Sequence, residues 1–354
     1  MVPDGYGPQA RLERRADVRC TVAADMRRRQ RRATALLMMA LFLAGCSHHE
    51  TANPAYYYID PDPTFPSALD YGPTWSPDGQ YIAYHHLTTC GNHYVEGVDG
   101  TYVTCVDGTG RRLLVPYGLD PDWSPSGHAI VYSCGSGSCI YDLVTGSMKV
   151  VFGSSGMHRP DWSPDGQKIA FARTVCCPSG IHISNQVTGQ TTWLAPGYSP
   201  DWSPDGRYLV FVHDCNVWSV STEDSTRRKI TAYRCGEHAV QTPHWHSGGE
   251  RIVFERDWKI WCIDADGSNL QLLGEGRSPA WSPDGETIAF AARSEALGDT
   301  VKQRIWIMNA DGSQQRQVTF PDAMTSGSVR QPNPPSGRPV MATGDWWPGS
   351  PSDQ

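Results

Sequence analysis

The chain has 354 residues, of which 19% are charged and 39% are hydrophobic, and its net charge is −7 with histidine counted as neutral. An acidic chain lacks the basic surface that nucleic-acid phosphates require, so no nucleic-acid partner is expected. The sequence contains no Gly-x-Ser-x-Gly elbow, no phosphate-binding loop and no dinucleotide fingerprint, which excludes the enzyme classes built on these motifs.

Residues 1–45 are predicted to be a signal peptide that is absent from the mature protein. Five arginines between residues 27 and 32 precede an apolar stretch, residues 33–44, which is too short to span a bilayer. The stretch leads into Leu43-Ala-Gly-Cys46, which resembles the lipobox of bacterial lipoproteins, where cleavage precedes the cysteine and its thiol receives a diacylglycerol. Met26 is the expected start. An ordinary secretory signal with an incidental cysteine is the alternative.

Lipidation of Cys46 would hold the protein on a membrane of the bacterial cell envelope, at its periplasmic or cell-surface face, without spanning it. Residues 1–45 contain nine arginines and four acidic residues, and removing this net +5 from −7 leaves −12 on the mature chain. That charge favours cationic ligands or basic partner surfaces. Residues 46–70, rich in proline and small polar residues, are predicted to be the lipidated tether.

One short phrase recurs through the rest of the chain. Trp-Ser-Pro-Asp-Gly occurs four times, and two altered copies, Trp123–Gly127 and Trp245–Gly249, complete a set of six. The six tryptophans are Trp75, Trp123, Trp162, Trp202, Trp245 and Trp281, with spacings of 48, 39, 40, 43 and 36 residues. Such a period is typical of solenoids, propellers and other repeat folds.

Each repeat predicts four antiparallel strands. Ser-Pro-Asp-Gly is a turn sequence, and a run of β-branched and aromatic residues with a period of two follows it, as in Lys168–Phe171. A third run, such as Arg304–Met308, leads to a hairpin turn, here Asp311-Gly312, and a fourth run ends the unit. Four strands in about 40 residues make one propeller blade.

The phrase Pro-x-Trp-Ser-Pro-Asp-Gly followed by x-x-Ile-Ala-Phe resembles the repeat of TolB-type β-propellers, which also occurs in the propeller domains of prolyl oligopeptidase relatives. The resemblance implies an all-β fold, a six-bladed β-propeller of four-stranded antiparallel blades over residues 71–325. Neither the hydrolase domain of the oligopeptidase relatives nor the N-terminal α/β domain of TolB is expected here. Residues 326–354 are a Pro/Gly-rich tail that either closes the ring or forms a degenerate seventh blade.

The residue before each tryptophan is the candidate binding position, whereas the tryptophans themselves are predicted to pack between blades. The resemblance implies that the tryptophan strand is innermost, which would place these residues near the channel mouth. They are Thr74, Asp122, Asp161, Asp201, His244 and Ala280. The three aspartates and His244 would form an acidic patch for a cation, or for the N-terminus or a lysine of a partner. Alternatively, a small polar residue simply suits this position.

His244 and His246 flank Trp245 and would share one strand face, a spacing compatible with a zinc or manganese site together with His238 and His158. The expected protein has no cofactor, and the metal site is the weaker alternative. Asp264–Gly267 is predicted to be a hairpin turn and not a calcium loop, because the glutamate that an EF-hand requires is absent.

Nine cysteines remain after the leader and Cys46, which indicates disulfides in an exported chain and leaves at least one thiol unpaired. The first predicted pair is Cys134 with Cys139, on either side of a short hairpin loop. Treating these two as directly opposite predicts that Ile130 faces Leu143. Bridges among the cysteines at positions 176, 177, 215 and 235 are expected but not assigned.

Two functions of different class follow. The first is a non-catalytic scaffold that binds an envelope protein or peptide, basic in character, or a glycan, through a loop-lined propeller face. The second is a metal-assisted propeller enzyme with a polysaccharide lyase-like activity, in which His244 and His246 hold the metal.

Overall fold

The computed structural model describes residues 67–90, 93–94, 99–135, 137–153, 157–173, 179–235, 240–293 and 301–320. All regular secondary structure in this part of the chain is β-strand. It contains no helix long and apolar enough to cross a membrane. The predicted signal peptide, Cys46, the tether and the C-terminal tail lie outside the described residues.

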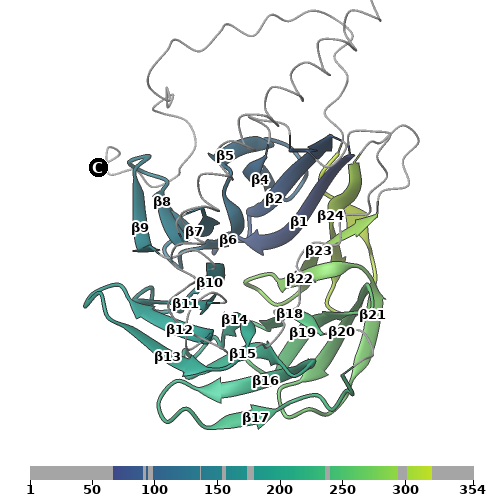
Figure 1. Ribbon diagram of the computed structural model, residues 1–354. Coiled ribbons are helices and arrows are strands. Elements are labelled where there is room, and N and C mark those ends of the chain that lie inside the picture. Colours follow the sequence, from purple (N-terminus) through teal and green to yellow (C-terminus); the bar gives the residue numbers. More distant parts are fainter. Residues whose placement is uncertain are drawn as a thin grey trace, which may run out of the picture.

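The described strands form six four-stranded units, here called blades 1–6, arranged around a centre (Figure 1). Blade 1 contains β1 (Ser67–Trp75), β2 (Tyr81–Cys90), β4 (Gly100–Cys105) and β5 (Arg112–Pro116), with β3 (His93–Tyr94) beside β2. Blade 2 contains β6 (Leu119–Trp123), β7 (Ala129–Cys134), β8 (Gly137–Asp142) and β9 (Met148–Gly153). Blade 3 contains β10 (Met157–Trp162), β11 (Lys168–Arg173), β12 (Gly180–Asn185) and β13 (Thr191–Ala195).

The other half of the ring is built in the same way. Blade 4 contains β14 (Tyr198–Trp202), β15 (Tyr208–His213), β16 (Asn216–Ser221) and β17 (Arg227–Lys229). Blade 5 contains β18 (Gln241–Trp245), β19 (Arg251–Arg256), β20 (Lys259–Asp264) and β21 (Gln271–Glu275). Blade 6 contains β22 (Arg277–Trp281), β23 (Thr287–Arg293), β24 (Val301–Asn309) and β25 (Arg316–Gln317). The predicted all-β fold of four-stranded antiparallel blades is confirmed.

The Ser-Pro-Asp-Gly turn connects the first two strands of a blade through its own side chains. In blade 1 the Ser76 hydroxyl donates to Asp78 Oδ1 (2.5 Å) and accepts the Tyr81 N–H (2.9 Å). Gly79 adopts a φ of 68°, a conformation that glycine reaches without strain. The aspartate of the repeat is therefore a turn residue, as its sequence context predicts.

The recurring tryptophans lie between blades. Trp202 packs with Ala170 and Ile181 of blade 3, and Trp123 packs with Ala83 and Val103 of blade 1. The other four likewise contact hydrophobic residues of the preceding blade, with Trp75 reaching blade 6. Each blade is too thin to bury both of its apolar faces alone, so these contacts supply the hydrophobic stabilisation of the ring.

The Cys134–Cys139 disulfide is present, but the register predicted from it is wrong. Ile130 faces Tyr141 instead of Leu143, because Cys134 itself lies opposite Gly137. The bridge is thus diagonal across the hairpin. A second disulfide joins Cys215 to Cys235, two of the cysteines left unassigned above. Among the described cysteines, those at positions 105 and 262 are free thiols.

Blades 6 and 1 meet through a parallel strand pair, β1 with β24, in which Ala68 faces Val301. Beside this pair, Arg304 and Asp70 form a buried ion pair with side-chain exposures of 2% and 0%. Asp70 also accepts the Thr319 hydroxyl (2.7 Å) and contacts His86 Nδ1 (2.5 Å). Polar groups buried this deeply require such partners. The network therefore joins the first strand of the ring to the last blade.

Replacing Asp70 by alanine is expected to destabilise the fold by about 3–5 kcal/mol, because it leaves the Arg304 charge buried without its counter-ion. Guanidinium unfolding of the purified chain measures the effect. Asp284→Ala is the control, since it removes two hydrogen bonds, from the Ser282 hydroxyl and the Glu286 N–H, in a turn where Asp284 is exposed, and it should cost about 1–2 kcal/mol. Equal losses in the two variants would show that ring closure does not depend on this pair.

Candidate functional site

Every innermost strand carries the same irregularity just before its tryptophan. The residue two positions before the candidate binding position has a positive φ, a proline follows it, and the strand pairing shifts register there. The positive-φ residues are Gly72, Asp120, Arg159, Ser199, Thr242 and Ser278. Proline has no N–H to donate, so it fits a point where the ladder is interrupted, and a bulge of this kind re-aims the side chain that follows.

These bulges line one cavity of about 100 Å³ at the centre of the ring. Each inner strand contributes its positive-φ residue, its proline and the residue before its tryptophan. All six candidate positions therefore lie together, namely Thr74, Asp122, Asp161, Asp201, His244 and Ala280. The lining residues lie one to three positions before the tryptophan of each inner strand, in the middle of the ring.

One oxygen of each aspartate has a structural partner that the sequence did not reveal. Asp122 Oδ2 accepts the Trp162 backbone N–H of the next blade (2.9 Å). Asp161 and Asp201 accept the tryptophan N–H of blades 4 and 5 in the same way, both at 2.7 Å. In blade 5, His244 Nδ1 lies 3.3 Å from the Trp281 nitrogen. The residue before the tryptophan thus links neighbouring blades. This hydrogen bond is a structural reason for a polar residue at that position, as the alternative interpretation of the sequence proposed.

The remaining oxygens connect the same side chains to one another. Asp122 Oδ1 accepts the Thr74 hydroxyl (3.0 Å). Asp161 lies close enough to Asp201 and Asp122 for their charges to raise its pKa. Asp201 Oδ1 lies 3.5 Å from His244 Nε2. The three carboxyl groups and the imidazole therefore form one continuous polar cluster.

Burial and mutual repulsion shift the ionisation of this cluster. Loss of water contact raises the pKa of Asp122 to about 6 and that of Asp201 to about 8. The pKa of Asp161 is raised well above its ordinary value by burial and then by the charges of Asp201 and Asp122. Burial also lowers the pKa of His244. Ionising all three acids together is thus unfavourable unless a cation is close.

His244 and His246 do not converge. Strand β18 ends at Trp245, so His246 already belongs to the following turn, where its Nδ1 contacts Glu250 (2.8 Å) and its ring lies edge-on against Trp281. The alternation on which their shared face depends ends one residue too early. Among the described residues, no group of three or more histidine, cysteine or carboxylate side chains is placed to hold a metal. His238 and the side chain of His158 lie outside this part.

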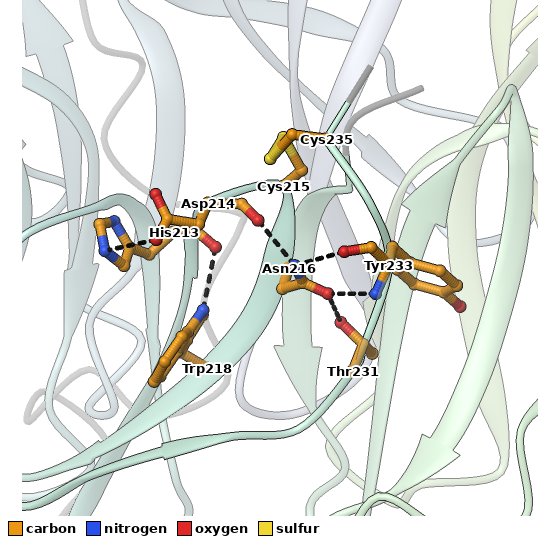
Figure 2. The surroundings of a disulfide bond; sticks show 8 residues. All are labelled: His213, Asp214, Cys215, Asn216, Trp218, Thr231, Tyr233 and Cys235. Carbon is orange, nitrogen blue, oxygen red and sulfur yellow. Dashed lines mark hydrogen bonds and ion pairs between the residues drawn. A yellow bond between two sulfur atoms is a disulfide. The ribbon is translucent and has the colours of Figure 1, made fainter. Parts of the chain in front are cut away.

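The loops at the end of the ring opposite the Ser-Pro-Asp-Gly turns include a stapled segment. The Cys215–Cys235 disulfide joins the β15–β16 hairpin to the chain that leads towards blade 5 (Figure 2). Next to it, buried Asn216 donates to the carbonyls of Asp214 and Tyr233 and accepts from the Thr231 hydroxyl and the Tyr233 N–H. All four hydrogen bonds of this amide are made, so the rim is fixed here.

Residues 94–333 match the family model of the TolB beta propeller domain. This chain belongs to that family. The repeat of this TolB-type propeller includes the inner strands described above. Each of them ends in Pro-x-Trp-Ser-Pro-Asp-Gly or in one of its two altered copies. No match was found among curated protein sequences.

The fold is similar to that of TolB from Acinetobacter baumannii, with a TM-score of 0.52 and 17% identity over 70% of this chain and 62% of that one. It is also similar to a putative TolB from Agrobacterium tumefaciens, with a TM-score of 0.50 and 20% identity over 59% and 84% of the two chains. This chain thus spans less than two thirds of the Acinetobacter protein. At these identities the similarity shows the fold alone.

An oligogalacturonate lyase in complex with manganese gives a TM-score of 0.48 and 15% identity over 75% of this chain and 80% of that one. That likeness is too weak to add to the description of this propeller.

The raised pKa values of the TolB-type cavity predict how stability depends on pH. A carboxyl whose folded pKa exceeds its unfolded value of about 3.9 stabilises the fold below that value, and the contribution is lost as pH rises through the folded pKa. For Asp201 the loss should extend to about pH 8. Asp201→Asn keeps an acceptor for the Trp245 N–H but cannot ionise. Its stability relative to wild type should therefore rise between pH 6 and 8.5, on the order of 1 kcal/mol or about 2–4 °C in Tm.

Thermal unfolding of both proteins from pH 4.5 to 8.5 checks this expectation. His244 has the opposite sign, because its pKa is lowered, and it removes stability as the pH falls below about 6.5. Above that pH the His244 contribution no longer changes, so the difference between the two profiles from pH 6.5 to 8.5 reports on the carboxyl groups. Parallel Tm profiles for the two proteins would contradict the assigned shift.

Proposed function

We propose that this chain is a cell-envelope lipoprotein whose propeller binds a basic protein or peptide at the central cavity, without catalysis. Asp122, Asp161, Asp201 and His244 are the binding residues. The observation that carries the proposal is that three carboxyl groups share one small cavity in which burial opposes their ionisation. The ammonium group of a lysine or of an N-terminus would stabilise the ionised acids and match the acidic charge of the mature chain.

The structural role of these positions does not require acids. The link to the next tryptophan needs only a hydrogen-bond acceptor, and His244 occupies the same position in blade 5 without a carboxylate. An asparagine would accept the same N–H without the cost of a buried charge. Three consecutive aspartates therefore exceed what the ring needs, which supports a role in binding.

A second polar group in the cavity supports the same proposal. The Thr242 side chain is only 6% exposed, lines the cavity, and its hydroxyl has no hydrogen-bond partner among the described residues. A buried hydroxyl without a partner costs about 1–3 kcal/mol. A ligand group that donates to or accepts from this hydroxyl would remove that cost.

The envelope location rests on the leader, on Cys46 and on the two disulfides, which persist in oxidising compartments. The metal-assisted enzyme is less well supported, because the described residues separate the imidazoles of His244 and His246. A neutral glycan would leave the charge of the carboxyl cluster uncompensated. A cationic polypeptide segment is therefore the ligand class that we favour.

Titration calorimetry with hexalysine amide as the probe tests the binding proposal. Wild-type protein should bind it, and Asp161→Asn combined with Asp201→Asn should weaken binding at least tenfold while both tryptophan hydrogen bonds keep an acceptor. The same peptide acetylated on every amine is the ligand control and should not bind. Equal affinity of the two proteins would place the binding of this probe elsewhere on the acidic surface.

Lipidation is tested separately. Mass spectrometry of the protein isolated from native membranes should find a chain that begins at Cys46 and carries a diacylglycerol thioether, and Cys46→Ser should release the protein from the membrane fraction. An unmodified Cys46, or a mature chain that begins upstream of it, would rule the anchor out.

A further inference from the structure

Trp258 lies on blade 5 at the end of the ring opposite the Ser-Pro-Asp-Gly turns, and it is 47% exposed. It occupies the tip of the hairpin between β19 and β20. Because Gln241 pairs with Glu255, this tip lies beside the start of β18, where the next residue, Thr242, lines the cavity. Neither the predicted interblade packing nor the carboxyl cluster involves this indole.

The backbone at this tip is unfavourable for a tryptophan. Asp257 and Trp258 have φ values of 58° and 62°, as in a type I′ turn, whose second residue is usually glycine. The chain places Asp-Gly at three other hairpins, at residues 107–108, 266–267 and 311–312. A bulky side chain in the left-handed region is an outlier and is retained only where something favours it.

The matching turn in blade 4 shows what such a position can be used for. Asp214 and Cys215 also have positive φ values, 45° and 60°, and there the second residue forms the disulfide with Cys235 (Figure 2). The strained position in blade 4 thus makes a covalent link. In blade 5 the same position instead presents a half-exposed indole.

The indole is held rigidly on one side. The Arg277 guanidinium carbon lies 4.3 Å from the centre of the Trp258 ring, and Arg277 Nε is 2.8 Å from Glu255 Oε1. Glu255 is buried and also accepts the Ser278 N–H (3.1 Å). The buried Glu255 carboxylate therefore compensates the charge of Arg277. The platform formed by Trp258 and Arg277 is neutral and pre-organised.

This platform adjoins the residues that line the cavity. The Gly276 N–H donates to the Trp258 carbonyl (2.8 Å), and a Cβ on Gly276 would lie 2.6 Å from the Phe290 ring, so the two segments are tightly packed. Arg277 follows Gly276 directly, and the next residue, Ser278, lines the cavity. A polypeptide ligand that is bound in the cavity and extends over blade 6 would therefore meet the Trp258 indole within a few of its own residues.

We propose that Trp258 is the second anchor of the ligand and takes an apolar or aromatic side chain of the same polypeptide segment whose cationic group enters the cavity. This inference rests on the proposed function and specifies the partner further. Exposed tryptophan and fixed arginine are the residues most often found at protein interaction hot spots. A neutral aromatic surface beside an acidic cavity matches a segment in which a basic residue and an apolar residue lie close together. An uncharged saccharide offers a ring for the indole but no cation for the cavity.

Calorimetry with two series of amidated hexapeptides tests the second anchor. Both series carry lysine at position 1 and glycine elsewhere, and one has a single phenylalanine at position 2, 3, 4, 5 or 6 where the other has alanine. On wild type, at least one phenylalanine peptide should bind at least tenfold more tightly than its alanine counterpart. Trp258→Gly creates an Asp-Gly turn that suits the backbone, and it should remove this advantage without lowering Tm.

The control variant is Tyr208→Ala, which removes a similarly exposed aromatic ring (45%) next to a Ser-Pro-Asp-Gly turn at the other end of the ring, and it should keep the phenylalanine advantage. If no phenylalanine peptide exceeds its counterpart on wild type, or if the advantage persists in Trp258→Gly, the inference is wrong. Chitotetraose that binds wild type but not Trp258→Gly, without any peptide preference, would overturn it in favour of a saccharide. Asp161→Asn separates the two proposals: if it leaves every affinity unchanged while Trp258→Gly removes the advantage, only the cavity assignment fails.

Discussion

The ring depends on one repeated hydrogen bond, from the backbone N–H of a tryptophan to a side chain of the preceding blade. The acceptors are Asp122, Asp161 and Asp201, with nitrogen–oxygen distances of 2.7–2.9 Å. Each donating tryptophan also packs its indole against the preceding blade. One residue, the tryptophan, therefore makes both a polar and an apolar contact with the preceding blade. Because the acceptors stand on the innermost strands, the contact that joins blades also sets the chemistry of the cavity.

The boundary between blades 6 and 1 cannot use this contact, because Ala280 has no side-chain acceptor. There the indole Nε1 of Trp75 donates to the Ala280 carbonyl instead (3.2 Å). The parallel pairing of β1 with β24 and the buried pair of Asp70 with Arg304 supply the remaining interaction. The two ends of the repeat array are thus joined by charge and strand pairing, whereas the interior boundaries from blade 2 to blade 6 rest on the repeated link.

The sequence predicted the features that recur in every repeat and missed the contacts between particular residues of different blades. The turns, the strand order, the tryptophan packing and the grouping of the six candidate positions follow from the period and from local residue chemistry. The second role of Asp122 was not predictable, because its partner, Trp162, lies 40 residues away in the next blade. The register taken from Cys134 and Cys139 failed because a disulfide can join diagonal as well as opposite residues. The proposed pairing of His244 with His246 assumed that β18 extends one residue further than it does.

A signal for the missed features was nevertheless present in the sequence. A proline two residues before each tryptophan marks a point where a central strand cannot continue its ladder, and that is where the bulge occurs. The position after that proline tolerates threonine, histidine and alanine as well as aspartate, so the fold alone does not dictate acids there. The acids occupy blades 2, 3 and 4 consecutively, with His244 following in blade 5, while Thr74 and Ala280 leave the other side of the cavity uncharged. A cation would therefore sit off the ring axis towards blades 2–4, and a chain that extends from it past His244 would meet Trp258, because both residues stand on blade 5.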